Sequence, residues 1–286
     1  MLSFLALAMA VALLSHPPNP SAVPAPAPLP AAALAPAPLD TLVNVGGHRL
    51  HFQVWKGTGP VILFEAGGGD DLAVWNKVLA PLQQATGATL LAYDRAGFGK
   101  SGLDSTRMRL GQQVADLKTG LDRLRLGRRY VVVAHSFGGF FATLFAATYP
   151  NQVKGAVLVD ASHVSYYTDA RLQFFESQYG HMRATFKAAE PGKYWMLENA
   201  TLDRDDMRKA PFPATIPVVD VLAEKPPTNS AQDLANWQQA HRQFVAAAPN
   251  RRLVTAAGSG HYVMADQPEL VTQTIAQLYQ SVRRRK

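Results

Sequence analysis

Ser136 is the first residue whose setting suggests chemistry, because it lies in the segment Ala134–Gly139, which reads AHSFGG. This segment joins an apolar, β-rich run, Tyr130–Ala134, to a stretch with helical composition, Gly138–Tyr149. A serine in a tight strand–turn–helix connection forms a nucleophile elbow, which lifts its hydroxyl out at the C-terminal edge of a sheet. The turn needs small flanking residues, and an alanine and a glycine stand two positions before and after Ser136. We therefore predict that Ser136 is a nucleophile.

His261 is the predicted base, because a serine hydroxyl is a weak nucleophile without one. It ends the segment Gly258–His261 (GSGH), straight after the last predicted strand, Leu253–Ala256. In a parallel sheet this loop opens at the same edge as Ser136. The residues Asp266–Glu269 (DQPE) carry capping-box residues and an early proline, so they predict a helix start that fixes the exit of the loop.

A pair of backbone N–H groups is needed to stabilise the negative oxygen that forms when serine attacks a carbonyl. Glu65–Gly69 (EAGGG) follows the buried strand Val61–Glu65, and its glycines allow the backbone to approach a substrate closely. We expect the N–H groups of Gly68 and Phe137 to form this oxyanion hole.

The acid that orients His261 should lie between serine and histidine in chain order. Asp160 directly follows the predicted strand Gly155–Val159 and is the favoured residue. Glu224, just beyond the strand Val218–Leu222, is the alternative acid, and a further, unidentified group is the third option. Geometry, not sequence position, defines this role.

The elements that must position these residues alternate between short β-rich runs and helical stretches. This alternation predicts an α/β fold with a mostly parallel sheet of roughly eight strands and helices on both faces. The remaining predicted strands are Thr41–Val45 and Leu50–Trp55, which form a hairpin, and Thr89–Asp94; the predicted helices are Leu72–Gln84, Val114–Leu126, Gly138–Tyr149, Leu234–Ala247 and Pro268–Val282.

The interval after the sixth strand is too long for a simple crossover and is rich in aromatic residues. We predict a helical cap at about 161–214 that covers an apolar substrate site. The tentative substrate-binding residues are Tyr166, Phe174, Phe175 and Trp195.

Composition excludes several other functions. The net charge is +7, but the basic residues are scattered and no nucleic-acid motif accompanies them, so no nucleic-acid partner is expected. The chain has no cysteine, which excludes a thiolate nucleophile and a cysteine-based zinc site, and no metal or cofactor is expected. Asp94–Ser101 contains two glycines after a strand but lacks the third glycine of a dinucleotide motif, so we interpret it as a structural turn near the site.

The N-terminus begins with the apolar run Leu2–Leu14, which has the length of a signal-peptide core and is too short to span a bilayer. We predict a signal peptide over residues 1–22, a Pro/Ala-rich linker over 23–40 and a catalytic domain over 41–286. The expected location is periplasmic or secreted, without a stable membrane span after processing; an uncleaved N-terminal anchor is the alternative.

The folded part resembles bacterial α/β-hydrolase-fold enzymes from about Leu42 to Val282. The motifs that carry the resemblance are Glu65–Gly67 (EAG), Tyr93–Gly97 (YDRAG), His135–Gly139 (HSFGG), Leu158–His163 (LVDASH), Gly258–Tyr262 (GSGHY) and Asp266–Glu269 (DQPE). The resemblance implies an α/β-hydrolase sheet and Ser/His chemistry, but it says little about the substrate, because the superfamily acts on many kinds of bond. Our leading hypothesis is a serine hydrolase that cleaves a carboxylic ester of a small to medium, largely apolar molecule through an acyl-enzyme.

The alternatives are an amide or peptide-bond hydrolase, aminopeptidase-like, on the same residues, or a non-catalytic ligand-binding member of the fold. Two departures from the family pattern are Ala134, where the elbow has glycine, and the usual acid position beyond Leu222, which holds no aspartate. Relatives that cleave epoxides or carbon–halogen bonds carry an aspartate in place of Ser136, so the resemblance disfavours those reactions.

Overall fold

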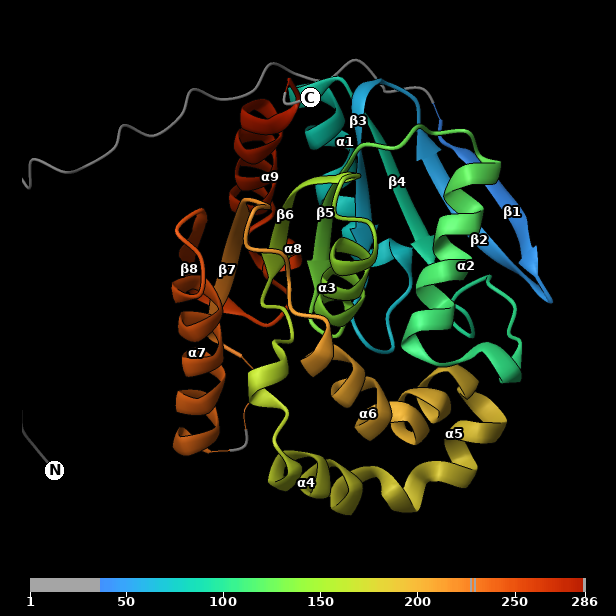
Figure 1. Ribbon diagram of the computed structural model, residues 1–286, viewed down its shortest axis with the longest axis vertical. Helices are drawn as coiled ribbons and strands as arrows, with labels where there is room; N and C mark the ends of the chain where they lie inside the picture. Colours follow the sequence, from blue (N-terminus) through green and yellow to red (C-terminus); the bar gives the residue numbers. More distant parts are fainter. Residues whose placement is uncertain (1–36, 227, 229, 285–286) are drawn as a thin grey trace, which may run out of the picture. The chain divides into compact units, whose positions relative to one another are not determined.

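The computed structural model describes residues 37–226, 228 and 230–284, and Figure 1 shows the chain as a ribbon. The predicted signal peptide and most of the predicted linker lie outside the described residues. No helix in the described part of the chain is long and apolar enough to cross a membrane.

An eight-stranded sheet forms the centre of the fold, with the strand order β1-β2-β4-β3-β5-β6-β7-β8. The hairpin β1–β2 pairs antiparallel with β4, and all the other neighbouring strands run parallel. This confirms the predicted mostly parallel sheet. The strands are β1 Leu39–Gly46, β2 His48–Trp55, β3 Thr58–Glu65, β4 Ala88–Asp94, β5 Tyr130–His135, β6 Val153–Val159, β7 Val218–Lys225 and β8 Arg251–Gly260.

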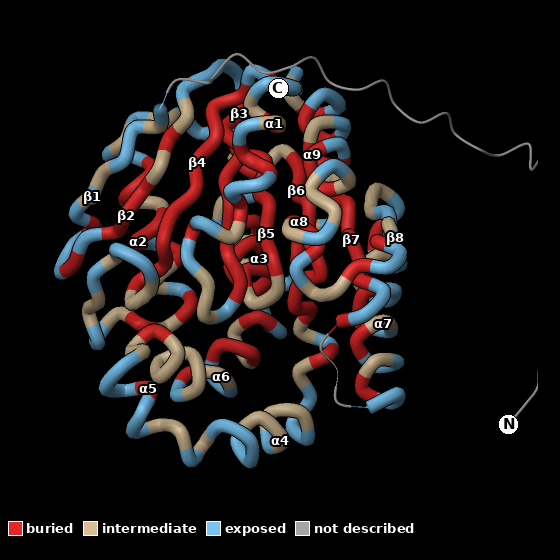
Figure 2. The backbone as a smooth tube through the Cα atoms, turned by 180° about the vertical axis from the view of Figure 1, so that it is seen from behind, coloured by how far each residue is buried: buried red, intermediate tan, exposed pale blue. Residues whose placement is uncertain are grey.

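Helices cover both faces of the sheet, so the central strands are buried on both sides. Continuous runs such as Val131–Val133 are fully buried, as strands sandwiched between two helical layers require. Figure 2 shows this burial as red tubes along the middle strands. On one face pack α1 (Asn76–Thr86), α8 (Val263–Asp266) and α9 (Pro268–Val282); on the other pack α2 (Leu110–Arg123), α3 (Gly138–Thr148) and α7 (Ala231–Ala246).

A helical segment is inserted between β6 and β7 and lies at the C-terminal ends of the parallel strands, below the sheet in Figure 1. We call this segment the cap. It contains the short 3-10 helices η3 (Val164–Tyr166) and η4 (Gly180–Met182) and the α-helices α4 (Asp169–Tyr179), α5 (Arg183–Ala189) and α6 (Pro191–Lys209).

Several element boundaries differ from the sequence prediction: the predicted helix Leu72–Gln84 is divided into a 3-10 helix, η1 (Leu72–Trp75), and α1, and β7 continues to Lys225. Two further differences have a local explanation. Helix α2 begins at Leu110 and not at Val114, because the Gln112 side chain accepts the Arg109 N–H (3.2 Å) and closes the first turn. Strand β8 continues to Gly260 and does not end at Ala256. An irregularity in its pairing with β7 and a left-handed φ of 78° at Gly258 let the strand continue through glycines that read as a loop.

Candidate active site

The turn after β5 holds Ser136 in a strained conformation, with a φ of 51°. The left-handed region is unfavourable for a residue with a side chain, and such strain is typical of a nucleophile elbow. Two backbone hydrogen bonds stabilise the turn: the Ser136 carbonyl accepts the N–H groups of Gly139 (2.9 Å) and Ser162 (2.7 Å). Space is limited around it: a Cβ on Gly138 would lie 2.7 Å from the Ala66 carbonyl oxygen. The small residues of the AHSFGG segment are therefore required by close backbone packing.

A chain of hydrogen bonds connects Ser136, His261 and Asp160. His261 Nε2 lies 2.9 Å from Ser136 Oγ, and His261 Nδ1 lies 2.6 Å from Asp160 Oδ2. Because a carboxylate only accepts hydrogen bonds, the proton of the neutral imidazole belongs on Nδ1, which leaves Nε2 free to accept the serine hydroxyl. This is the arrangement that general-base activation of a serine needs.

Asp160 lies at the end of β6, fully buried, with a left-handed φ of 42°. Its Oδ1 accepts two hydrogen bonds, from the Ala223 N–H (3.1 Å) and from Trp237 Nε1 (2.9 Å), while Oδ2 faces His261. Its own N–H donates to the Val221 carbonyl (2.6 Å). Strand β7 and helix α7 thus fix the carboxylate in one orientation. This contact of Trp237 could not be predicted from its sequence position, which is typical of an apolar residue in an amphipathic helix.

Glu224, the alternative acid, lies exposed near the end of β7. Its Oε2 accepts the Gly258 N–H at 2.5 Å, which ties β7 to the irregular part of β8. Asp160, and not Glu224, therefore contacts His261, whereas Glu224 connects β7 to β8.

The loop that carries His261 is fixed on both sides. Asp266 Oδ2 accepts the Gly260 N–H (2.8 Å), whereas α9 has Gln267 at its N-cap without a side-chain hydrogen bond. Asp266, which was predicted to cap the helix, therefore binds the backbone of the His261 loop and does not cap α9. On the other side, the buried His135 lies with Nε2 3.1 Å from the His261 carbonyl oxygen and donates to it. Burial lowers the pKa of His135, which keeps this ring neutral.

The predicted oxyanion turn lies beside the elbow. The Arg95 guanidinium donates to the carbonyls of Ala66 and Gly67, which holds the backbone of the turn in place. A Cβ on Gly68 would lie 3.3 Å from the Cβ of Phe137 and 2.8 Å from the Met196 side chain. The two predicted N–H donors thus belong to neighbouring residues, with helix α6 of the cap directly over them.

Glu65 lies beneath this turn and is fully buried next to Arg95, with the two side chains 3.6 Å apart. Burial raises the pKa of Glu65 to about 7, although the positive charge of Arg95 acts in the opposite direction. The Tyr93 hydroxyl also donates to this carboxyl group. The charge of Glu65, which lies beside the arginine that holds the turn, therefore changes near neutral pH.

The four aromatic cap residues do not meet in one place. Tyr166 and Phe174 line a cavity of about 420 Å³ between the cap and α7, and Phe175 lines a separate cavity of about 530 Å³. Trp195 packs against the main hydrophobic core and against Tyr194. Neither cavity has Ser136 or His261 in its lining. The cap residues whose side chains lie against the predicted oxyanion turn are Met196, next to Gly68, and Lys193, next to Gly69, and neither was among the predicted substrate-binding residues.

A second polar cluster lies next to the acid. His163, Asp220 and His241 are buried together, and His241 Nε2 is 3.9 Å from Asp160 Oδ1. These three side chains are of the types that can hold a metal ion.

Known proteins share this architecture. A protein of Bacillus subtilis described as "Uncharacterized protein YqjL" is 25% identical over 256 residues, which cover 85% of this chain and 98% of that protein. A thermophilic esterase from Thermogutta terrifontis superposes with a TM-score of 0.62 at 18% identity, covering 86% of this chain and 99% of the esterase. An epoxide hydrolase from Vigna radiata superposes with a TM-score of 0.66 at 16% identity, covering 85% and 99% of the two chains.

At such low identities the structural matches establish the fold and leave the reaction open. The family model for the alpha/beta hydrolase fold matches residues 60–282, which include the elbow, Asp160, the cap and the loop of His261. With the eight-stranded sheet and the strained serine at the end of β5, this match shows that the chain belongs to the alpha/beta hydrolase fold family.

Proposed function

We propose that this protein is a serine hydrolase that cleaves carboxylic esters through an acyl-enzyme. The observation that carries the proposal is the hydrogen-bonded chain from Ser136 through His261 to the buried Asp160. A strained serine joined to a base, whose orientation is fixed by an acid, is the constellation required for acyl transfer.

In the first half of the reaction, Ser136 Oγ attacks the ester carbonyl carbon while His261 Nε2 takes the hydroxyl proton. The carbonyl oxygen becomes negative and is stabilised by the N–H groups of Gly68 and Phe137. Asp160 stabilises the imidazolium through Nδ1. Collapse of the tetrahedral intermediate breaks the bond to the alcohol oxygen, which leaves with the proton from His261.

In the second half, a water molecule gives its proton to His261 and attacks the acyl carbon. The second tetrahedral intermediate releases the carboxylic acid and returns the proton to Ser136 Oγ. One ester and one water molecule give one alcohol and one acid, and Ser136, His261 and Asp160 return to their starting protonation states.

The side chain at position 136 favours an ester over an epoxide. A carboxylate nucleophile that opens an epoxide forms an ester, which water can hydrolyse. A serine hydroxyl would form an ether instead, which this site could not hydrolyse. The similarity in fold to an epoxide hydrolase therefore does not extend to the proposed reaction.

The surroundings of Phe137 favour a short acyl group. The cavity beside this ring has a volume of only about 10 Å³, and its lining includes Phe141 and Met196 but neither Ser136 nor His261. Because Met196 also lies against Gly68, a long acyl chain would have to displace α6. We expect acetyl and butyryl esters to react faster than octanoyl esters.

The test is the turnover of p-nitrophenyl esters of graded acyl length by the wild type and by Ser136→Ala. We expect hydrolysis by the wild type, with the highest kcat/KM for short chains, and covalent labelling of Ser136 by a fluorophosphonate. The matching p-nitroanilides test the amide alternative, which would replace our proposal if anilides were cleaved faster than esters. A protein that neither turns over esters nor takes up the label would be a non-catalytic member of the family.

A further inference from the structure

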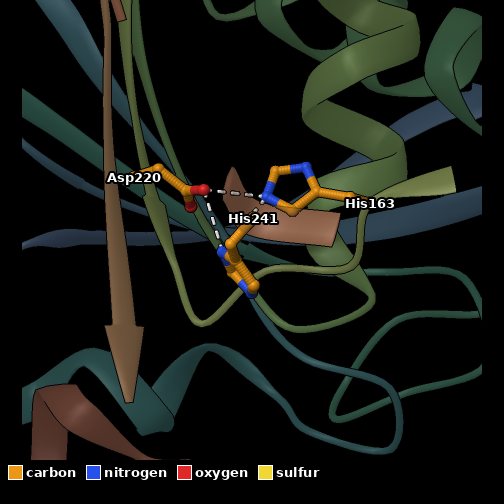
Figure 3. A group of neighbouring side chains, drawn as sticks. All are labelled: His163, Asp220 and His241. Atoms are coloured by element: carbon orange, nitrogen blue, oxygen red, sulfur yellow. Dashed lines mark hydrogen bonds and ion pairs between the residues drawn. The ribbon is translucent and has the colours of Figure 1, made fainter. Parts of the chain in front are cut away.

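Three buried side chains from distant parts of the sequence point toward one another, as Figure 3 shows. One of them, His241, has its Nε2 3.9 Å from Oδ1 of the proposed acid, Asp160. Asp220 comes from the middle of β7, His163 precedes η3, and His241 lies in α7. Asp220 and His241 are completely buried, and His163 is 6% exposed. The proposed ester hydrolysis assigns no step to any of them.

We propose that His163, Asp220 and His241 form a binding site for a divalent transition metal, with zinc as the best match. Two imidazole nitrogens and one carboxylate oxygen are the donor set of many three-ligand zinc sites, which a water molecule completes. Cysteine-free chains can build such a site, and the wide spacing of these ligands leaves no short sequence motif.

The spacing of the three donor atoms fits one ion. Asp220 Oδ2 lies 3.0 Å from His163 Nε2 and 2.8 Å from His241 Nδ1, and the two nitrogens are 3.3 Å apart. In a tetrahedral zinc site with bonds of about 2.0–2.1 Å, neighbouring ligand atoms are separated by about 3.3–3.4 Å. Outward shifts of a few tenths of an ångström would therefore open the triangle enough for zinc.

Unsatisfied atoms support an ion at this place. Asp220 Oδ1 and His241 Nε2 are buried and have no hydrogen-bond partner in the described part of the chain. If His241 Nδ1 donated a hydrogen bond to Asp220, the neutral ring would carry its only proton on Nδ1. The lone pair of Nε2 would then face Asp160 Oδ1, 3.9 Å away, which is an unfavourable contact between two acceptors. If Nδ1 instead binds a metal, Nε2 carries the proton and faces that carboxylate. Metal-bound histidines usually direct their second N–H to a carboxylate in this way.

The charge balance points in the same direction. Within the described residues, Asp220 forms no ion pair with a lysine or an arginine, and its contacts are the two histidines. Arg251 lies nearby, but its guanidinium donates to the carbonyls of Phe212 and Phe244. A buried carboxylate without a cation is costly, and a bound divalent ion would compensate it.

A cavity touches the cluster at His163. This residue lines a cavity of about 500 Å³, together with Phe212, Phe244 and Arg251. The His163 ring stacks on Phe244, with centroids 4.3 Å apart, and its Nε2 points toward Asp220. An ion entering here would be bound behind Asp160, outside the reacting groups.

The experiment titrates chelator-treated, tag-free protein with Zn²⁺ by calorimetry and with Co²⁺ by visible absorption. We expect one ion per chain, a tetrahedral Co²⁺ spectrum, and a melting temperature raised by about 5–10 °C at a hundredfold excess over Kd. His163→Phe should retain the stacking on Phe244 and weaken binding about 100-fold or more, as should His241→Gln. Asp220→Asn tests the third ligand, and circular dichroism checks that each variant is folded.

Two controls make the outcome decisive. His181→Gln removes an exposed histidine and should leave metal binding unchanged. Ser136→Ala should bind metal normally while losing ester turnover, so that failure of the metal proposal is separate from failure of the proposed function. The proposal is wrong if the folded wild type binds no ion at about 100 μM Zn²⁺, a Kd that corresponds to a binding free energy of about 5.5 kcal/mol. It is also wrong if the folded variants His163→Phe and His241→Gln bind zinc as tightly as the wild type does, or if His181→Gln abolishes binding.

Discussion

Replacing Asp160 by asparagine tests how the site is built, because the substitution changes one atom of the carboxyl group. Asp160 Oδ1 accepts hydrogen bonds from Ala223 and Trp237, so the asparagine side chain will keep its oxygen on that side. Its amide NH2 then replaces Oδ2, which faces His261 Nδ1 at 2.6 Å. An NH2 group donates, so Nδ1 must accept and the imidazole proton moves to Nε2.

The size of the effect follows from this change of tautomer. With a proton on Nε2, the ring can no longer accept the Ser136 proton over their 2.9 Å contact. An acid-to-amide change of this kind lowers kcat about 10⁴-fold, or about 5.5 kcal/mol in the activation free energy. Because both hydrogen bonds to Oδ1 remain, we expect the free energy of unfolding to change by less than about 1 kcal/mol.

The assay measures kcat with p-nitrophenyl acetate and the melting temperature of the same preparations. Glu224→Gln is the matched control, since Glu224 is exposed and its oxygen that accepts the Gly258 N–H can be kept by an amide. It should retain activity within about twofold of the wild type. The reasoning fails if Asp160→Asn keeps kcat within tenfold of the wild type, or if Glu224→Gln is the inactive variant.

Three further predictions concern the nucleophile, the oxyanion turn and the N-terminus. Ser136→Ala should fold normally and reduce ester kcat by on the order of 10³–10⁶, and residual turnover within tenfold would exclude this serine as nucleophile. Glu65 has a raised pKa of about 7, so its contribution to stability is present below about pH 4.5 and is lost as the pH rises through 7. Glu65→Gln should remove this loss, worth about 3 kcal/mol at most, and parallel plots of melting temperature against pH for the two proteins would refute the pKa shift. We also propose that the chain is exported and cleaved after the apolar run Leu2–Leu14, so intact mass of protein from its native host should show a shortened N-terminus, whereas a full-length cytosolic product would contradict export.

The sheet and the placement of Ser136 and His261 at one edge of it could be anticipated because their signals are local. The run Tyr130–Ala134 is followed at once by Ser136 and a glycine pair, and a strand–turn–helix connection leaves little freedom in where that serine points. Likewise, the edge of a parallel sheet to which His261 belongs follows from strand direction alone.

What the sequence missed depends on contacts between distant residues. Trp237 lies 77 positions after the carboxylate that it orients, and its spacing in α7 is that of any buried helix residue. The continuation of β8 to Gly260 depends on pairing with Lys225, which glycine-rich local sequence cannot reveal. The aromatic composition of the cap predicted a substrate site, but it could not tell that Tyr166 would bond to Asp233 rather than face Ser136.

The position of Asp160 before the cap has a consequence for how this enzyme could change. Ser136 and Asp160 end neighbouring strands whose register pairs His135 with Val159, so both belong to the continuous segment from β5 to β6. The cap enters the chain only after this segment, and of the three proposed catalytic side chains just His261 arrives from beyond it. Insertions, deletions or exchange of residues 164–209 could therefore reshape the proposed substrate site while the proposed nucleophile and its proposed acid keep their spacing, which makes this chain a suitable scaffold for grafting foreign caps.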